Sequence, residues 1–148
     1  MGRATRLKPV QDISHKKELE AVKSLVKTKA KHQKKVSELG EVKNYQQEYL
    51  SRFQQMEGRS ISAVQLQGHH AFLGNLANVV EQQELQVSES TLEVQASERH
   101  WGLMRMGKDV VNKVAERYQQ QEQKAAFRKE QKNLDELASR QAKLGFLI

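Results

Sequence analysis

The sequence predicts an all-α protein, a long antiparallel two-helix coiled coil (an α-hairpin) whose second helix extends past the first at the C-terminus. Three observations predict this fold. Strong helix formers dominate the 148 residues, and the single proline, Pro9, lies near the N-terminus. Apolar residues recur at the three- and four-residue steps of heptads. One interruption that contains glycines divides the chain into two helical parts.

The first helix is expected over about residues 12–56, because no proline follows Pro9 and the residues beyond it favour helix. Its apolar residues fall at steps of three, four or seven and predict one narrow seam. The residues of this seam are Val36, Leu39, Val42, Tyr49, Phe53 and Met56.

A turn region is expected over residues 57–68. Gly58, Gly68 and the serines between them weaken a helix and favour a turn. Helices as long and as poor in apolar residues as these two need a partner. Both helices therefore belong to one domain that spans residues 1–148.

The second helix is expected over about residues 69–140, where a 3–4 alternation of seam residues continues for about seven heptads. A seam this narrow is typical of a coiled coil and not of a helix in a globular core. Its apolar positions are Leu73, Leu76, Val80, Val87, Val94, Trp101, Met104, Val111, Ala115 and Tyr118. Polar residues fill the seam positions between them, at Gln83, Ser90, Ser97 and Lys108.

Charge is divided into blocks that suit an antiparallel pair. Residues 1–37 carry a net charge of +8, residues 38–101 carry −5 and residues 102–148 carry +4. If the turn is centred near Ser60, the numbers of facing residues add up to about 121, and the basic first block lies along acidic residues, as charged coiled-coil flanks do. The expected pairs are Lys23 with Glu98, Lys27 with Glu93, Lys31 with Glu89 and Lys35 with Glu84.

The same register leaves the residues after about Tyr118 without a partner. This basic segment is rich in helix formers but sparse in apolar residues, and we expect it to fray in water. The chain termini are expected to be flexible.

No catalytic constellation is recognisable in the sequence. A Gly-rich phosphate loop is missing, and neighbouring His69 and His70 point about 100° apart on a helix, so they do not converge on one metal. A two-helix coiled coil also lacks the concave pocket that catalysis needs. We therefore expect no enzyme, no catalytic residue, no metal and no cofactor.

No segment is apolar enough to span a membrane, and the N-terminus lacks the apolar core of a secretory signal. The absence of cysteine fits a reducing compartment. These features predict a cytoplasmic protein that does not insert directly into a membrane.

Several segments together resemble the FliJ family of flagellar export proteins. They are the run NYQQEY at 44–49, the run AFLGNL at 71–76 and the C-terminal run RKEQKNLDELASR at 128–140. Trp101 in the middle of the second helix and the two-helix layout agree with this resemblance, which covers nearly the whole chain.

The resemblance implies a soluble component of the flagellar type III export apparatus, peripherally associated with the inner membrane. Such proteins are similar to the central stalk of rotary ATPases. The coiled coil would sit in the hexameric export ATPase and promote its assembly and activity. It would also contact the cytoplasmic domain of the membrane-embedded export gate protein and escort the export chaperones that carry substrates.

The resemblance also implies a surface that binds the export gate. Four residues match the family pattern: Tyr45, Tyr49, Phe72 and Leu76. Four further positions of this surface depart from the pattern: Glu38, Val42, Val79 and Gln83. Paired across the hairpin, the numbers of these residues each add up to 121, so the eight form one face, although several could instead fill the seam.

The contacts with the ATPase are inferred only from charge and position. By analogy with a rotary stalk, the end of the hairpin that holds the chain termini faces the ring. The basic residues proposed for this end are Lys16, Lys23, Arg117 and Arg128.

Three alternatives remain open at the level of sequence. A virulence-type injectisome has an equivalent stalk protein, although such relatives tend to lack the FliJ-like runs at 44–49 and 128–140. A basic coiled coil could bind RNA through the lysines of residues 27–35, but no aromatic residue lies among them for base stacking, so no nucleic acid is expected. A homodimeric rod would pair its heptads between chains instead.

Overall fold

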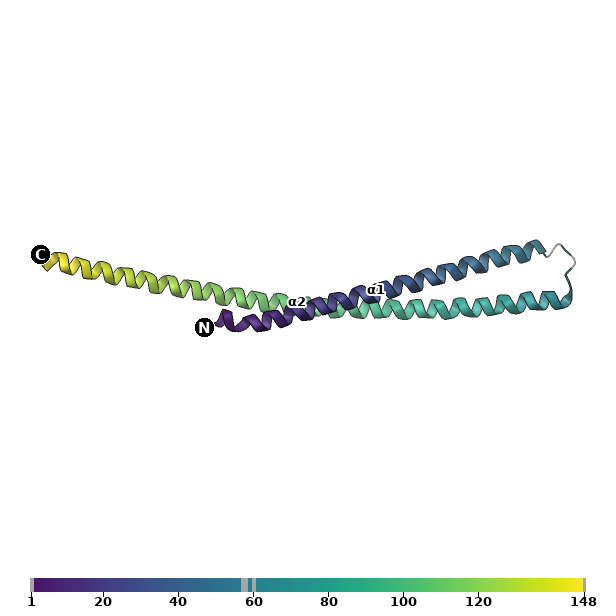
Figure 1. Ribbon diagram of the computed structural model, residues 1–148, viewed down its shortest axis with the longest axis horizontal. Coiled ribbons are helices and arrows are strands. Elements are labelled where there is room, and N and C mark those ends of the chain that lie inside the picture. The colour runs from purple at the N-terminus through teal and green to yellow at the C-terminus, as the bar shows by residue number, and fades with distance from the viewer. Residues whose placement is uncertain (1, 57–58, 60, 148) are drawn as a thin grey trace. The chain divides into compact units, whose positions relative to one another are not determined.

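Two helices make up nearly all of the protein. The structure, a computed structural model, describes residues 2–56, 59 and 61–147. Helix α1 comprises Arg3–Met56 and helix α2 comprises Ala63–Leu147, and no strand occurs among the described residues (Figure 1). The prediction of an all-α helical hairpin is confirmed.

The chain divides into two compact units, each built from a segment of both helices. One unit spans Glu20–Gly102, and the other combines the residues up to Leu19 with those from Leu103 onward. Contacts between α1 and α2 within each unit join residues far apart in the sequence, with increasing numbers in α1 meeting decreasing numbers in α2. The two segments in each unit therefore run antiparallel.

Helix α1 begins at Arg3, well before the expected start near residue 12, and it includes Pro9. Proline removes one helical hydrogen bond, which typically costs about 3 kcal/mol in a helix interior. Here the backbone N–H of Ala4 donates to Glu122 Oε1 of α2 at 3.2 Å, so a carboxylate caps the positive end of the helix. This cap and the half-buried Leu7 hold the first turns against α2.

Helix α2 begins at Ala63, within the region expected to be a turn. Ser62 and Gln65 form a capping box: the Gln65 N–H donates to Ser62 Oγ at 3.2 Å and the Ser62 N–H donates to Gln65 Oε1 at 3.4 Å. Ser62, which is expected from the sequence to favour a turn, is therefore a helix cap. Of the remaining turn region, Glu57, Gly58 and Ser60 lie outside the described residues.

The predicted seam of α2 is confirmed position by position. Each of its apolar and polar seam residues is buried or half-buried, from Leu73 to Tyr118. The least exposed are Ser90 at 3% and Ala115 at 7%. Polar residues thus complete the seam without breaking its period.

The seam of α1 is longer than predicted, and two residues of the predicted seam, Val36 and Met56, lie outside it. It starts at Ala4 and runs to Phe53. Val36 is 39% exposed because it lies on the flank beside the seam, and Met56 is 41% exposed at the last residue of α1, where Leu66 on α2 is 40% exposed as well. The heptad positions of α1 are Ala4, Leu7, Gln11, Ser14, Glu18, Ala21, Leu25, Thr28, His32, Lys35, Leu39, Val42, Gln46, Tyr49 and Phe53.

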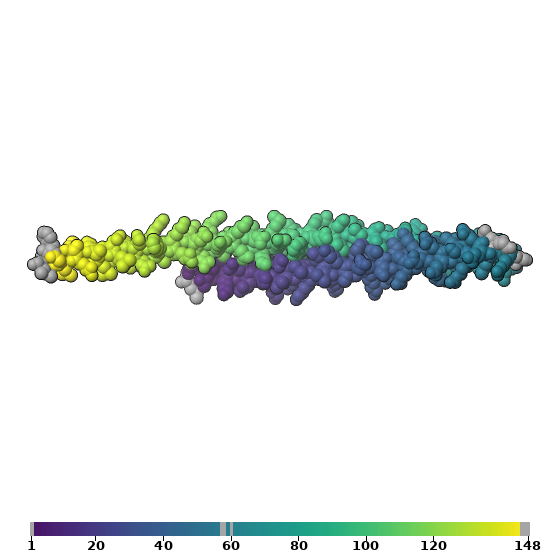
Figure 2. All heavy atoms as spheres, turned by 90° about the horizontal axis from the view of Figure 1, so that it is seen from above, coloured from purple at the N-terminus to yellow at the C-terminus, as the bar shows by residue number. Residues whose placement is uncertain are grey.

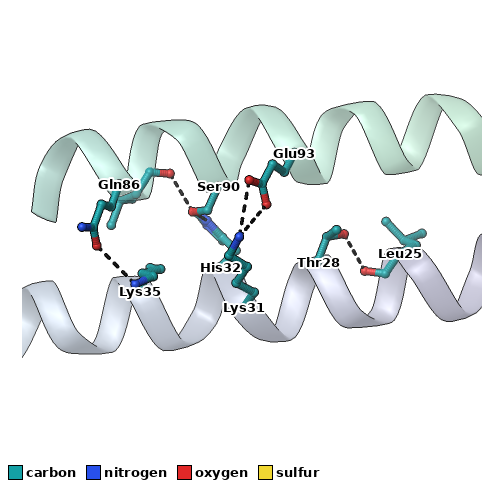
Figure 3. A network of polar contacts seen from close by, with 9 residues as sticks. Leu25, Thr28, Lys31, His32, Lys35, Gln86, Ser90 and Glu93 are labelled. Carbon is teal, nitrogen blue, oxygen red and sulfur yellow. Dashed lines mark hydrogen bonds and ion pairs between the residues drawn. The ribbon is translucent and has the colours of Figure 1, made fainter.

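A polar layer crosses the seam at His32 and Ser90 (Figure 3). The Ser90 hydroxyl donates to the Val87 carbonyl at 2.8 Å, so His32 Nδ1–H is the donor in the 2.7 Å bond to Ser90 Oγ. Both polar groups are then satisfied within the seam. Nearby, Lys31 donates to both carboxylate oxygens of Glu93 (Figure 3).

Ion pairs join the flanks of the two helices, but the lysines are not those predicted. The glutamates meet lysines that lie four to eight residues later in α1, because long side chains on the flanks reach along the helix axis instead of straight across. Such exposed pairs typically contribute about 0.2–1 kcal/mol each and favour one register. The observed pairs are Lys29 with Glu98 at 3.9 Å, Lys31 with Glu93 at 3.2 Å and Lys43 with Glu84 at 3.2 Å.

The C-terminal part of α2 continues past the start of α1. After Glu122, every side chain described through Gly145 is exposed, and no second helix lies beside this segment (Figures 1 and 2). It is helical to Leu147, beyond the expected end near residue 140. Its content of strong helix formers accounts for this extension. We call residues 123–147 the overhang.

We expect Ser90→Ala to lower the free energy of unfolding by about 1–2 kcal/mol, since it leaves His32 Nδ1–H without its acceptor in the seam. The exposed Ser88 is a matched control, and Ser88→Ala should change stability by less than about 0.5 kcal/mol. Urea unfolding followed by circular dichroism measures both. Equal stability of the two variants would contradict the role given to the polar layer.

Candidate functional site

An aromatic cluster joins α1 and α2 near the connection between them, inside the unit that spans Glu20–Gly102. The Tyr49 and Phe72 rings lie 4.6 Å apart between centroids, and the Tyr45 and Phe72 rings lie 6.3 Å apart in an edge-to-face arrangement. Both distances fall in the range of attractive aromatic pairs. Two of these rings come from α1 and one from α2, so the cluster depends on the hairpin.

Three further residues extend this cluster toward the connection. Phe53 packs against His69 and His70, with ring centroids 5.4 and 5.6 Å apart. The Tyr49 hydroxyl is hydrogen-bonded to His69 Nδ1. We use the name aromatic cluster for Tyr45, Tyr49, Phe53, His69, His70 and Phe72.

The cluster has a buried base and an exposed rim. Phe53 is 7% exposed and Tyr49 is half-buried, whereas Tyr45 and Phe72 are 48% and 37% exposed. The Phe72 ring contacts both tyrosine rings. Large aromatic side chains displayed in this way are typical of interface hot spots.

The eight residues of the predicted gate-binding surface occupy two kinds of heptad position. Four lie in the seam at d positions: Val42, Tyr49, Leu76 and Gln83. Four lie at g positions, on the flank beside the seam: Glu38, Tyr45, Phe72 and Val79. In an antiparallel coiled coil the g positions of both helices share one side, so the flank presents Tyr45, Phe72 and Val79 together.

Ring contacts bring Tyr45, Tyr49 and Phe72 together among the predicted residues. Glu38 pairs with Lys35 of its own helix at 3.8 Å. Gln83 Oε1 is buried and has no hydrogen-bond partner among the described residues. An unpaired buried oxygen lowers the stability of the coiled coil at that seam position. Val79 is 39% exposed.

Sequence reasoning placed Phe53 in the seam but did not connect it to the two histidines. The signal was available, because Phe53 and His69 satisfy nearly the same facing rule as Tyr49 and Phe72. The divergence of His69 and His70 around the helix lets both imidazoles contact the Phe53 ring.

The four basic residues predicted to face an ATPase are all exposed and carry no ion pair within the described part of the chain. Lys16, Arg117 and Arg128 belong to the unit that contains the overhang. Lys23 belongs to the other unit. The unit that contains the overhang thus displays three exposed cationic side chains without an ion pair among the described residues.

Residues 2–56, 59 and 61–147 contain no candidate metal site, because no three His, Asp or Glu side chains lie close enough together to hold one ion. Neither helix, over its described length, holds a stretch long and apolar enough to cross a lipid bilayer.

Comparison with known protein families matches residues 3–144 to the family described as the flagellar FliJ protein. No curated protein sequence and no solved structure matches the chain. The family match spans both helices, the aromatic cluster and most of the overhang.

We expect Phe53→Ala to lower the free energy of unfolding by about 3 kcal/mol, since it empties the buried base of the aromatic cluster. Leu92→Ala is the matched control, because Leu92 is 63% exposed in the same unit, and it should cost less than about 0.5 kcal/mol. Urea titrations of both variants, followed by circular dichroism, give the comparison. A loss below about 1 kcal/mol for Phe53→Ala would contradict the burial described here.

Proposed function

Because this chain belongs to the flagellar FliJ family and is therefore a component of the flagellar export apparatus, we propose that it acts there as a stalk. In this role it promotes assembly and activity of the hexameric export ATPase. It also contacts the cytoplasmic domain of the export gate protein and helps to escort export chaperones. It performs these roles by binding and not by catalysis, on the cytoplasmic side of the membrane.

The aromatic cluster is the observation that carries the gate contact. Its rim residues Tyr45 and Phe72 are exposed on one flank and contact each other, and Tyr49 packs against Phe72. Aromatic side chains have few rotatable bonds and lose little conformational freedom on binding, which favours affinity. Glu38 and Val79 flank this pair at the same heptad position and would form the margin of the contact.

The ATPase contact is proposed for the unit that holds the overhang. Arg117 and Arg128 are exposed on α2, and Lys16 is exposed on α1. Free cationic side chains suit a ring whose inner surface carries acidic groups, because complementary charge accelerates and orients association.

A protein partner accounts for the basic residues better than RNA does. Lys29 and Lys31 are engaged in ion pairs with α2, and Lys35 is held by Glu38 and by Gln86. These contacts compete with phosphate for the same ammonium groups. The chaperone role is proposed on family grounds alone and is assigned no residues.

Gate binding is tested by titrating the purified full chain with the cytoplasmic domain of the export gate protein. We expect Tyr45→Ala and Phe72→Ala each to weaken binding at least about tenfold, since both remove an exposed anchor. Leu92→Ala, at an exposed position of the same unit, is the control for Phe72→Ala and should bind within about twofold of the unchanged protein. Equal affinity of all four proteins would exclude the aromatic rim as the gate contact.

ATPase stimulation is tested by measuring ATP hydrolysis and ring assembly of the export ATPase with and without the chain. We expect stimulation that Arg117→Glu and Arg128→Glu reduce several-fold, because each reverses a charge proposed to face the ring. Lys34→Glu, at an exposed position of the other unit, should leave stimulation unchanged. Absence of any stimulation by the unchanged chain would remove the stalk role without affecting the gate test.

A further inference from the structure

The overhang carries a second apolar stripe in a heptad frame of its own. The hairpin seam reaches Glu122, and the next positions in its frame are Ala125, Lys129 and Lys132, which offer no apolar surface beyond one methyl group. The stripe begins instead at Phe127 and follows steps of seven and three residues. Its members and their exposed fractions are Phe127 (61%), Leu134 (58%), Leu137 (54%) and Leu144 (62%).

This stripe faces away from the side of α2 that packs on α1. In the frame of the hairpin seam Phe127 and Leu134 occupy f positions, the outermost of a heptad. The stripe also fits a separate heptad assignment. In this assignment Phe127 and Leu134 occupy position a, and Leu137 and Leu144 occupy position d. An a/d stripe of this kind is the signature of a helix that needs a partner helix.

Charge is arranged to leave the stripe accessible to another helix. The charged residues of the overhang beyond Phe127 lie mostly at b, c and f positions of the new frame: Arg128, Lys129, Lys132, Asp135, Glu136 and Lys143. The positions beside the stripe are uncharged at Gln131, Asn133 and Ala138 and charged only at Arg140. Flanks with so little charge repel no helix of the same sequence.

We propose that the stripe pairs with the same stripe of a second copy of this chain, with the two overhangs antiparallel. In this arrangement the numbers of facing residues add up to 271. Phe127 then meets the partner's Leu144, and Leu134 meets the partner's Leu137. Apolar side chains face apolar side chains at every one of these layers.

Glu130 selects the antiparallel direction. It is the one charged residue at an a or d position between Phe127 and Leu144. Antiparallel pairing places its carboxylate opposite the partner's Gln141, whose amide can donate a hydrogen bond. Parallel pairing would place two Glu130 carboxylates face to face in the seam, where like charges are costly.

The start of α1 leaves room for this partner. The backbone N–H of Ala4 is bonded to Glu122, which fixes the first turn of α1 at the level of Glu122. The partner's Leu147 would face Lys124, so the partner's helix ends close to where α1 begins. The stripe also lies on the opposite side of α2 from α1, so the two helices do not compete for one seam.

Self-association is tested on the full chain by sedimentation equilibrium over roughly 1–500 µM, a range that covers weak interfaces. About three heptads make a short coiled coil, so we expect a reversible dimer and not a permanent one. Leu134→Asp should weaken it at least about tenfold by placing a charge in the seam. Ser139→Asp adds the same charge at an f position and should change the dissociation constant by less than about twofold.

A monomer at every concentration would overturn the proposal and leave the stripe for the ATPase or another protein. Equal effects of the two aspartate variants would overturn it as well, since the dimer would then form elsewhere. Neither result depends on the ATPase or the gate protein, so it leaves the proposed stalk function untouched.

Crosslinking tests the direction of pairing, and the chain offers no background because it has no cysteine. Lys124→Cys and Gly145→Cys lie on the same flank, and a Cβ built at Gly145 meets nothing within 4 Å. Mixing the two variants under oxidation should give a mixed disulfide, whereas each alone should give none, because equal positions would be about 30 Å apart. A disulfide-linked dimer of the Lys124→Cys variant alone, or no mixed disulfide, would overturn the antiparallel pair.

Discussion

Burial of side chains along one narrow seam between two antiparallel helices is the constraint on which the rest of this structure depends. In the part of the chain that the structure describes, neither helix has a second layer to cover it, so each residue lies in the seam, on its flanks or in solvent. Among the described residues Ala21, Phe53, Ala115 and Ser90 are the buried ones. With so little buried area, small changes of register would exchange seam and solvent positions, and the register must be specified by other means.

Polar seam residues supply much of that specification. His32 and Ser90 form a hydrogen-bonded layer in one unit, and Glu18 and Lys108 form an ion pair of 3.9 Å across the seam of the other. A buried polar pair adds little stability over an apolar one, yet a shifted register would leave each group unpaired. The aromatic cluster depends on this register as well, since Tyr49 and Phe72 meet only when the helices align.

How much the sequence could predict differed between the two helices for a physical reason. In α2 apolar residues mark most heptads, so the 3–4 alternation located every seam position from Leu73 to Tyr118. In α1 the first heptads are marked by residues such as Gln11, Ser14 and Glu18, which carry no hydropathy signal, so the sequence did not indicate the early part of this seam. The helix was expected to start too late because a proline, Pro9, lies in its first turns. The ion pairs were misassigned because a facing rule describes backbones, whereas lysine and glutamate reach along the axis. The gate-binding residues came from family resemblance, and the ring contacts between Tyr45, Tyr49 and Phe72 could not be obtained from spacing alone.

The place of the aromatic cluster beside the connection bears on how the hairpin forms. Tyr49 and His69 are 20 residues apart in sequence, whereas Ala4 and Glu122 are 118 apart. Closing the short loop costs less chain entropy, and each later layer then closes on a loop that is already mostly ordered. The hairpin is therefore built to nucleate at its aromatic end and to zip toward its termini. Mechanical tension applied where the chain ends would peel it open in the reverse order, with the aromatic cluster separating last.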